Sequence, residues 1–159
     1  MHARMRQASL ITAIAVTLTV AIGGTAFAQS VGTWKLNVAK STYHQGQAPK
    51  SLTVKYEAAG AGVKATVDWV SADNSVIHYA YTANYDGKDN FVIGHPYGDM
   101  AARTRVNART TKIVMKKGGK ITTTQALVTS GDGKTLTITT AGTDAQGQNV
   151  DSIGVYDKQ

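Results

Sequence analysis

The chain has 159 residues, with 17 basic side chains, 10 acidic ones and no cysteine. This length suits a single domain, and the lack of cysteine excludes a scaffold held together by disulfides. The positive formal charge keeps a small domain soluble and mildly favours anionic partners.

The first 28 residues have the pattern of a secretory signal peptide. Arg4 and Arg6 form a positive start, an apolar run extends from Leu10 to Gly23, and Ala26-Phe27-Ala28 has the small-x-small form of a cleavage site. A transmembrane anchor is the alternative, but the apolar run is shorter than the roughly 20 residues that span a bilayer. We therefore predict cleavage after Ala28, a periplasmic or secreted location, and a mature domain of residues 29–159 that does not span a membrane.

The mature region is rich in Thr, Val, Tyr and Gly and contains only two prolines, Pro49 and Pro96. This composition, with turn signals about every eight to twelve residues, favours an all-β fold. Residues 52–57 show the pattern clearly, because Leu52, Val54 and Tyr56 alternate with polar side chains. About ten strands are predicted, at residues 31–38, 52–57, 63–69, 76–83, 90–93, 100–106, 110–117, 120–129, 135–139 and 150–156.

Successive strands joined by tight turns predict an antiparallel up-and-down meander. A meander of this length tends to curl, and closing it into a β-barrel removes its exposed edges. We expect the first strand, which carries Trp34, to pair with the last strand near Tyr156. Residues 39–50 are polar and irregular, with room for one turn of helix.

Gly32-Thr33-Trp34-Lys35-Leu36 resembles the first strand of the calycins, the superfamily of the lipocalins and the intracellular fatty-acid-binding proteins. Val155-Tyr156-Asp157-Lys158 is similar to the last strand of the fatty-acid-binding proteins. The resemblance implies a ligand-binding barrel in which the ring of Trp34 plugs the closed end. Two features depart from the family: Gly154 stands where the family has the arginine of its carboxylate clamp, and residues 39–50 are too short and polar for the usual pair of capping helices.

A barrel of this size can hold one small, largely apolar or amphipathic ligand, or it can fill its interior with side chains. Tyrosine and methionine suit a pocket, because tyrosine has an apolar body with a polar tip and methionine adapts to irregular shapes. The candidate lumen residues are Tyr56, Trp69, Tyr79, Tyr81, Phe91, Met100, Met115 and Tyr156.

Residues 103–120 contain basic side chains and no acidic one. The predicted basic patch consists of Arg103, Arg105, Arg109, Lys112, Lys116, Lys117 and Lys120. Strand alternation turns Arg103 and Arg105 away from the face of Met100. It likewise turns Lys112 and Lys116 away from the face of Met115, which places these cations on the outside of two paired strands. A solvated face is one interpretation, and a docking site for an acidic protein or an anionic envelope partner is the other. If the alternation runs the other way, Arg103 or Arg105 points inward and supplies an anchor for an anion.

The sequence shows no catalytic constellation, so we expect a binding protein and not an enzyme. His44, His78 and His95 are widely spaced, and none has a metal-ligand pattern around it. Neither a nucleophile motif nor a phosphate loop is present, and Glu57 is the only glutamate. No cofactor, metal or nucleic-acid partner is expected. Two functions stay open: a carrier with a ligand in its lumen, or a solid barrel that docks or inhibits through its basic outer face.

Overall fold

The computed structural model describes residues 30–144 and 147–159. The predicted signal peptide lies outside these residues, so it stays a prediction. Within the described residues, no helix is long and apolar enough to cross a membrane. The chain forms eleven strands there: β1 (Gly32–Leu36), β2 (Thr42–Gln45), β3 (Ser51–Ala59), β4 (Gly62–Val70), β5 (Val76–Ala83), β6 (Asp86–Ile93), β7 (Met100–Arg105), β8 (Thr110–Lys117), β9 (Lys120–Thr129), β10 (Thr135–Thr143) and β11 (Asn149–Lys158).

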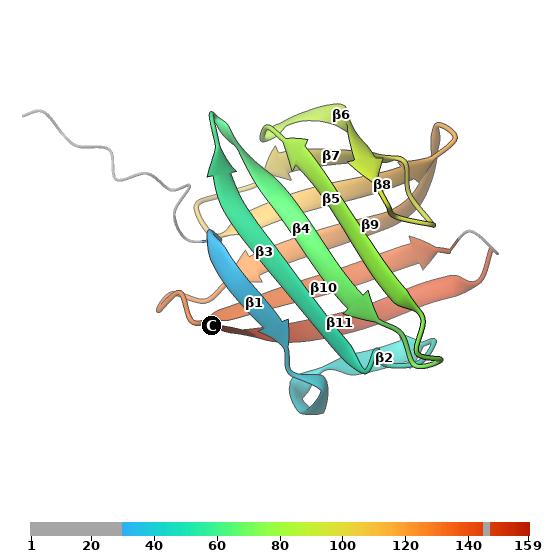
Figure 1. The fold of residues 1–159 in the computed structure, drawn as a ribbon. Coiled ribbons are helices and arrows are strands. Elements are labelled where there is room, and N and C mark those ends of the chain that lie inside the picture. Colours follow the sequence, from blue (N-terminus) through green and yellow to red (C-terminus); the bar gives the residue numbers. More distant parts are fainter. Residues whose placement is uncertain (1–29, 145–146) are drawn as a thin grey trace, which may run out of the picture.

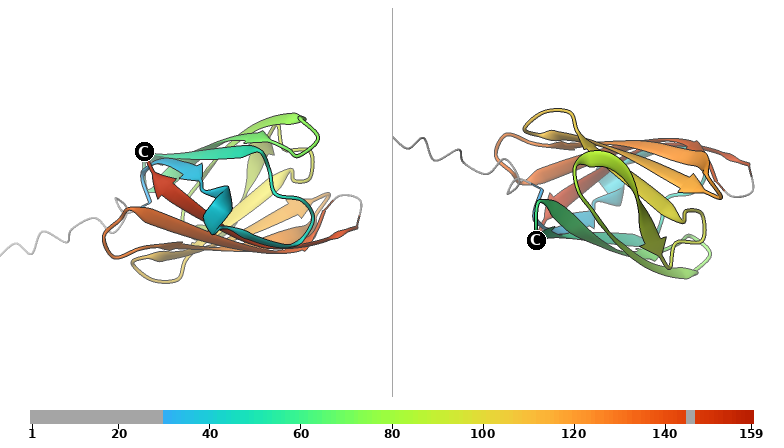
Figure 2. Two further views of the ribbon diagram at one scale, coloured as in Figure 1. Left: turned by 90° about the horizontal axis from the view of Figure 1, so that it is seen from below. Right: turned by 90° about the horizontal axis from the view of Figure 1, so that it is seen from above.

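The strands form one closed antiparallel sheet, which confirms the predicted meander barrel. From β3 to β11, each strand pairs with the next one along the chain. β1 closes the sheet because it pairs with both β3 and β11, and Trp34 lies between Val54 and Lys158. Figure 2 shows the result as one wall of strands β3–β5 facing a second wall of strands β8–β11.

The stretch between β1 and β3 is more regular than its sequence predicts, because it adds a strand to the turn of helix for which the sequence has room. It contains a short 3₁₀ helix, η1 (Val38–Lys40), and the strand β2, which pairs with β11 at Tyr43 and Ser152. β1 covers only the last residues of β11, so the remaining edge of β11 has unpaired backbone groups that β2 can bond. No pair of capping helices forms, as expected from the length of this stretch.

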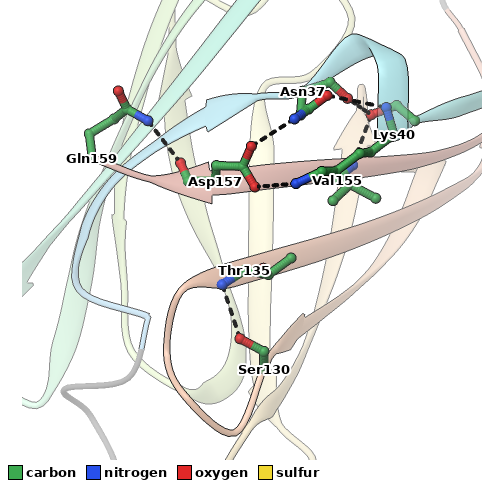
Figure 3. Close-up of polar contacts among 8 residues, drawn as sticks. Asn37, Lys40, Ser130, Thr135, Val155, Asp157 and Gln159 are labelled. Atoms are coloured by element: carbon green, nitrogen blue, oxygen red, sulfur yellow. Dashed lines mark hydrogen bonds and ion pairs between the residues drawn. The ribbon is translucent and has the colours of Figure 1, made fainter.

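Side chains reinforce the junction where β1 leaves β11 (Figure 3). Asn37 donates a hydrogen bond of 2.7 Å from Nδ2 to Asp157, and the Lys40 ammonium lies 3.2 Å from the same carboxylate. The hydrogen bond from Asn37 and then that from Lys40 lower the pKa of Asp157. On the neighbouring turn, the Thr135 backbone N–H donates to the Ser130 hydroxyl at 3.0 Å.

Trp34 is a core residue of the closed end, which agrees with its predicted structural role. Its side chain is fully buried, and its indole N–H donates a 2.8 Å hydrogen bond to the Ser30 carbonyl. The Lys158 ammonium lies 5.2 Å from the ring centroid, within the range of a cation–π contact. Trp34 therefore links β1 to β11 at the point where the barrel closes.

Replacing Trp34 with alanine should lower the free energy of unfolding by about 3–5 kcal/mol, because it leaves a large cavity and removes the link between β1 and β11. Urea unfolding followed by far-ultraviolet circular dichroism measures this change. Lys35→Ala is the matched control, since Lys35 is the exposed neighbour on the same strand and should change stability by less than about 0.5 kcal/mol. A loss below about 1 kcal/mol for Trp34→Ala would contradict the structural role.

Candidate functional site

The barrel is hollow and contains a cavity of about 410 Å³ that opens at one end. The opening lies between the turn that precedes β3 and the hairpins β6–β7 and β10–β11, which all contribute lining residues. A cavity of this volume lies within the range of about 300–1,000 Å³ typical of sites for small molecules. The predicted alternative of a solid barrel is therefore wrong.

The lining combines aromatic, apolar and polar side chains. The aromatic members are Tyr43, Tyr56, Trp69, Tyr79, Tyr81, Tyr97 and Tyr156. The apolar members include Leu52, Val54, Val67, Met115 and Ile138, and the polar ones include Gln45, His95, Thr123, Gln125 and Thr140. An apolar wall with several separate hydrogen-bonding groups suits an amphipathic molecule.

Most of the predicted lumen residues line this cavity. They are Tyr56, Trp69, Tyr79, Tyr81, Met115 and Tyr156. The predictions for Phe91 and Met100 are wrong, because these two residues lie opposite each other on β6 and β7 and point outward. Phe91 is 76% exposed, and its neighbour Val92 takes the buried position opposite Tyr81.

The outward placement of Arg103 and Arg105 is also wrong, because β7 has the opposite alternation from the one expected. Arg103 lies opposite Ile113, and Ala101 lies opposite Met115. Directly opposite residues in an antiparallel pair point to the same face, so the inward residues of β8 fix Ala101 and Arg103 inward. A register one residue away would have placed the arginines outside, beside Lys112 and Lys116.

The predicted basic patch therefore does not exist as one surface. Arg103 is fully buried and Arg105 is partly buried, whereas Arg109 is exposed on the β7–β8 turn at the closed end. The lysines face outward or sit in a turn. Lys112 lies on the outer wall, and Lys116, Lys117 and Lys120 lie at the β8–β9 hairpin beside the open end.

Arg103 carries a positive charge beneath the tyrosines of the lumen. Its Nη1 donates to the Tyr81 hydroxyl at 3.2 Å, and its guanidinium carbon lies 4.8 Å from the centroid of the Tyr56 ring and 5.5 Å from that of Tyr85. The Arg103 Nε and Nη2 atoms are buried and have no hydrogen-bond partner among the described residues. A buried charge is costly unless it is compensated, and here the Tyr81 hydroxyl and the aromatic faces support the cation.

This arrangement makes Tyr81 a hydrogen-bond donor toward the lumen. Its oxygen accepts from Arg103, so its own hydrogen can go to an acceptor in the cavity. Burial raises the pKa of Tyr56 and Tyr156, and these hydroxyls therefore keep their hydrogens at neutral pH. Arg103 itself lies behind this layer and lines a separate pocket of only about 10 Å³ toward the closed end.

The mouth of the cavity contains residues that no pattern in the sequence indicates. His95 packs against Tyr79, with ring centroids 4.3 Å apart, and its Nδ1 accepts a 3.0 Å hydrogen bond from the backbone N–H of Tyr97. Tyr43 enters from β2, the strand that was expected to be irregular. Loop residues have no periodic pattern, so only the three-dimensional arrangement brings these side chains to the cavity.

Gly154 leaves room on β11 for the ring of Tyr156. A Cβ atom at this position would lie 2.8 Å from the Tyr156 ring, so any side chain would push that ring from its place. Trp69, on the opposite wall, has a buried indole N–H without a partner among the described residues.

The three histidines of the described residues form no common site. His44 is exposed on β2, His78 makes a 2.6 Å contact with Asp68 on the outer wall, and His95 lies at the cavity mouth. In the part of the chain that the structure describes, no group of histidine and carboxylate side chains could hold a metal ion.

Comparison with protein-family models gives no match, and neither does comparison with curated proteins. Among solved structures, the chain is similar to zebrafish ileal bile acid-binding protein complexed with cholic acid, at 14% sequence identity and a TM-score of 0.46. The match covers 82% of this chain and 99% of the other. The strand pairing establishes the barrel without this likeness.

The free energy of unfolding should depend on pH because His95 has a different pKa in the folded and unfolded states. Burial, and then the charge of Lys117, lowers the pKa of His95 to about 4. Between about pH 4 and about pH 6.5, the imidazole of His95 is protonated in the unfolded chain but not in the folded protein. The free energy of unfolding should therefore fall by on the order of 2–3 kcal/mol as the pH drops from about 6.5 to about 4. Urea unfolding at several pH values measures this loss.

His95→Gln is the control for this prediction, because glutamine does not titrate while the carboxylates of the protein stay the same. The variant should lose less stability than the wild type over that pH range. If the free energy of unfolding changed equally with pH in the two proteins, the pKa of His95 would not be lowered in the folded state, which would contradict the prediction.

Proposed function

We propose that the protein is an exported carrier that binds one small amphipathic molecule in its lumen. The observation that supports this most strongly is the open cavity of about 410 Å³ with its lining of seven aromatic side chains. A protein that used the barrel only as a rigid body would gain stability by filling such a volume, because empty apolar space is costly. The export step rests on the N-terminal sequence alone.

The polar groups suggest how such a molecule is oriented. Its electron-rich group, such as a carboxylate, sulfonate or carbonyl, faces the Tyr81 hydroxyl, where the Arg103 charge strengthens the donor. Its apolar body contacts Val54, Val67 and Ile138 along the walls. Arg103 thus supplies the anion anchor that Gly154 does not, and acts through a tyrosine in place of direct contact.

The lumen can be tested with the fluorescent probe 8-anilinonaphthalene-1-sulfonate. Thr140 and Thr139 are neighbours on β10, but only Thr140 lines the cavity, whereas Thr139 is exposed. Thr140→Trp should weaken probe binding by roughly tenfold or more because the ring fills the lumen. Thr139→Trp should leave the affinity unchanged.

Circular dichroism and urea unfolding check that both variants are folded. Equal affinity of the two variants would place the probe outside the lumen and overturn the proposal. Native mass spectrometry of the purified protein gives a second reading, since a carrier should release a small molecule that the Thr140→Trp variant lacks.

The orientation of the ligand can be tested with two probes that share an apolar body. 8-Anilinonaphthalene-1-sulfonate has a negative charge and N-phenyl-1-naphthylamine has none. Tyr81→Phe should weaken binding of the charged probe by roughly tenfold and that of the neutral probe much less. Tyr79→Phe is the control, since Tyr79 lines the same lumen and no contact with Arg103 is seen among the described residues. Equal losses for both probes would contradict the proposed donor.

A further inference from the structure

Large apolar side chains are exposed on the outer wall beside the open end of the barrel. Phe91 is 76% exposed and Ile93 is 77% exposed, both near the end of β6, and Ile121 at the start of β9 is 62% exposed. Most apolar side chains of a soluble domain that are this exposed occur singly. Here they share one sector of the wall, which calls for a physical reason.

The pairing register shows that these residues form a belt. Phe91 lies opposite Met100, Met100 lies opposite Lys116, and Lys116 lies opposite Ile121. Adjacent strands are about 4.8 Å apart, so the belt crosses four strands on one outward face. We call the side chains of Phe91, Ile93, Lys116 and Ile121, together with the exposed Lys117 and Lys120 at the end of the β8–β9 hairpin, the rim face.

The rim face combines its apolar residues with positive charge. Lys117 and Lys120 lie opposite each other next to the Gly118-Gly119 turn, and neither forms an ion pair among the described residues. Lys116 is paired with Asp89 at 2.8 Å, which leaves the belt with a net positive charge. On another part of the same rim, the β10–β11 hairpin carries the acidic side chains Asp144 and Asp151.

The convex shape of this surface favours a lipid bilayer over a folded protein as its partner. The outer wall of a closed barrel is convex, and Phe91 and Ile93 are exposed on it and line neither the lumen nor the small pocket at the closed end. Protruding aromatic and aliphatic side chains flanked by lysines match the boundary of a bilayer, where the apolar groups enter the acyl region and the ammonium groups meet anionic headgroups.

We propose that the rim face docks the protein on an anionic lipid surface. The geometry requires no ligand in the lumen, so docking and lumen binding can fail independently. Docking through the rim face places the mouth of the cavity next to the bilayer, because His95 and Tyr97 of the mouth lie in the loop that directly follows Ile93.

Co-sedimentation with lipid vesicles tests the proposal. The wild type should bind vesicles of equal parts phosphatidylglycerol and phosphatidylcholine, and should bind phosphatidylcholine alone at least roughly tenfold more weakly. Binding should also weaken as salt is raised, because the lysines are exposed and their charges are screened. Absence of binding to the anionic vesicles at low salt would overturn the proposal, and so would equal binding to both vesicle types.

Two variants separate the contributions of charge and apolar contact. Lys117→Gln/Lys120→Gln should weaken binding to the anionic vesicles by roughly tenfold, and Phe91→Thr/Ile93→Thr should weaken it by a similar factor. Both sets of positions are exposed, so the folded state should survive, and the fluorescence titration of the lumen should be unchanged.

Matched controls lie on other outward faces of the barrel. Lys35→Gln/Lys64→Gln removes the same charge from β1 and β4, and Val128→Thr/Ile153→Thr removes exposed apolar side chains from β9 and β11. Both controls should bind vesicles like the wild type. Equal losses in the controls and the rim-face variants would show nonspecific adsorption and would overturn the proposal.

Discussion

The structure depends on the antiparallel hydrogen bonds that β1 makes on both of its edges. Without β1, the edges of β3 and β11 would be open, and exposed edges invite pairing with other chains. β1 also sets the lumen, because Gly32 lies opposite Tyr56 and Leu36 lies opposite Tyr156. The two flanking strands are thereby held in the register that points both tyrosines inward.

Much of this fold could be predicted from the sequence because alternation and turn residues act locally. Leu52, Val54 and Tyr56 share one face of β3 in the sequence and in the structure, and Ile113 and Met115 do so on β8. Closure of the barrel could be predicted because exposed strand edges are unfavourable and because Trp34 marks the first strand. The strand β2 could not be predicted, since its pairing depends on the free edge of β11, which exists only once β1 has left it.

The candidate site was predicted only in part, and β7 shows why. In residues 100–106, Met100, Ala102 and Val106 alternate with Arg103 and Arg105, so alternation alone turns the arginines outward, and the structure has the reverse. The orientation is set by Ile113 and Met115 of the neighbouring strand. Burial of Arg103 becomes tolerable because tyrosines from β3 and β5 and Tyr85 surround it, an arrangement that no short sequence pattern encodes.

The same alternation divides the wall at the open end into two chemically different faces. Val92 points to the core and Phe91 to the outside, so one strand serves the interior and the rim face at once. The two faces are also joined mechanically. The Gly118 N–H of the β8–β9 hairpin donates to Asp99 at 2.8 Å, and Asp99 ends the loop that carries His95 and Tyr97. A contact that binds Lys117, the residue before Gly118, therefore acts on the segment that borders the cavity mouth.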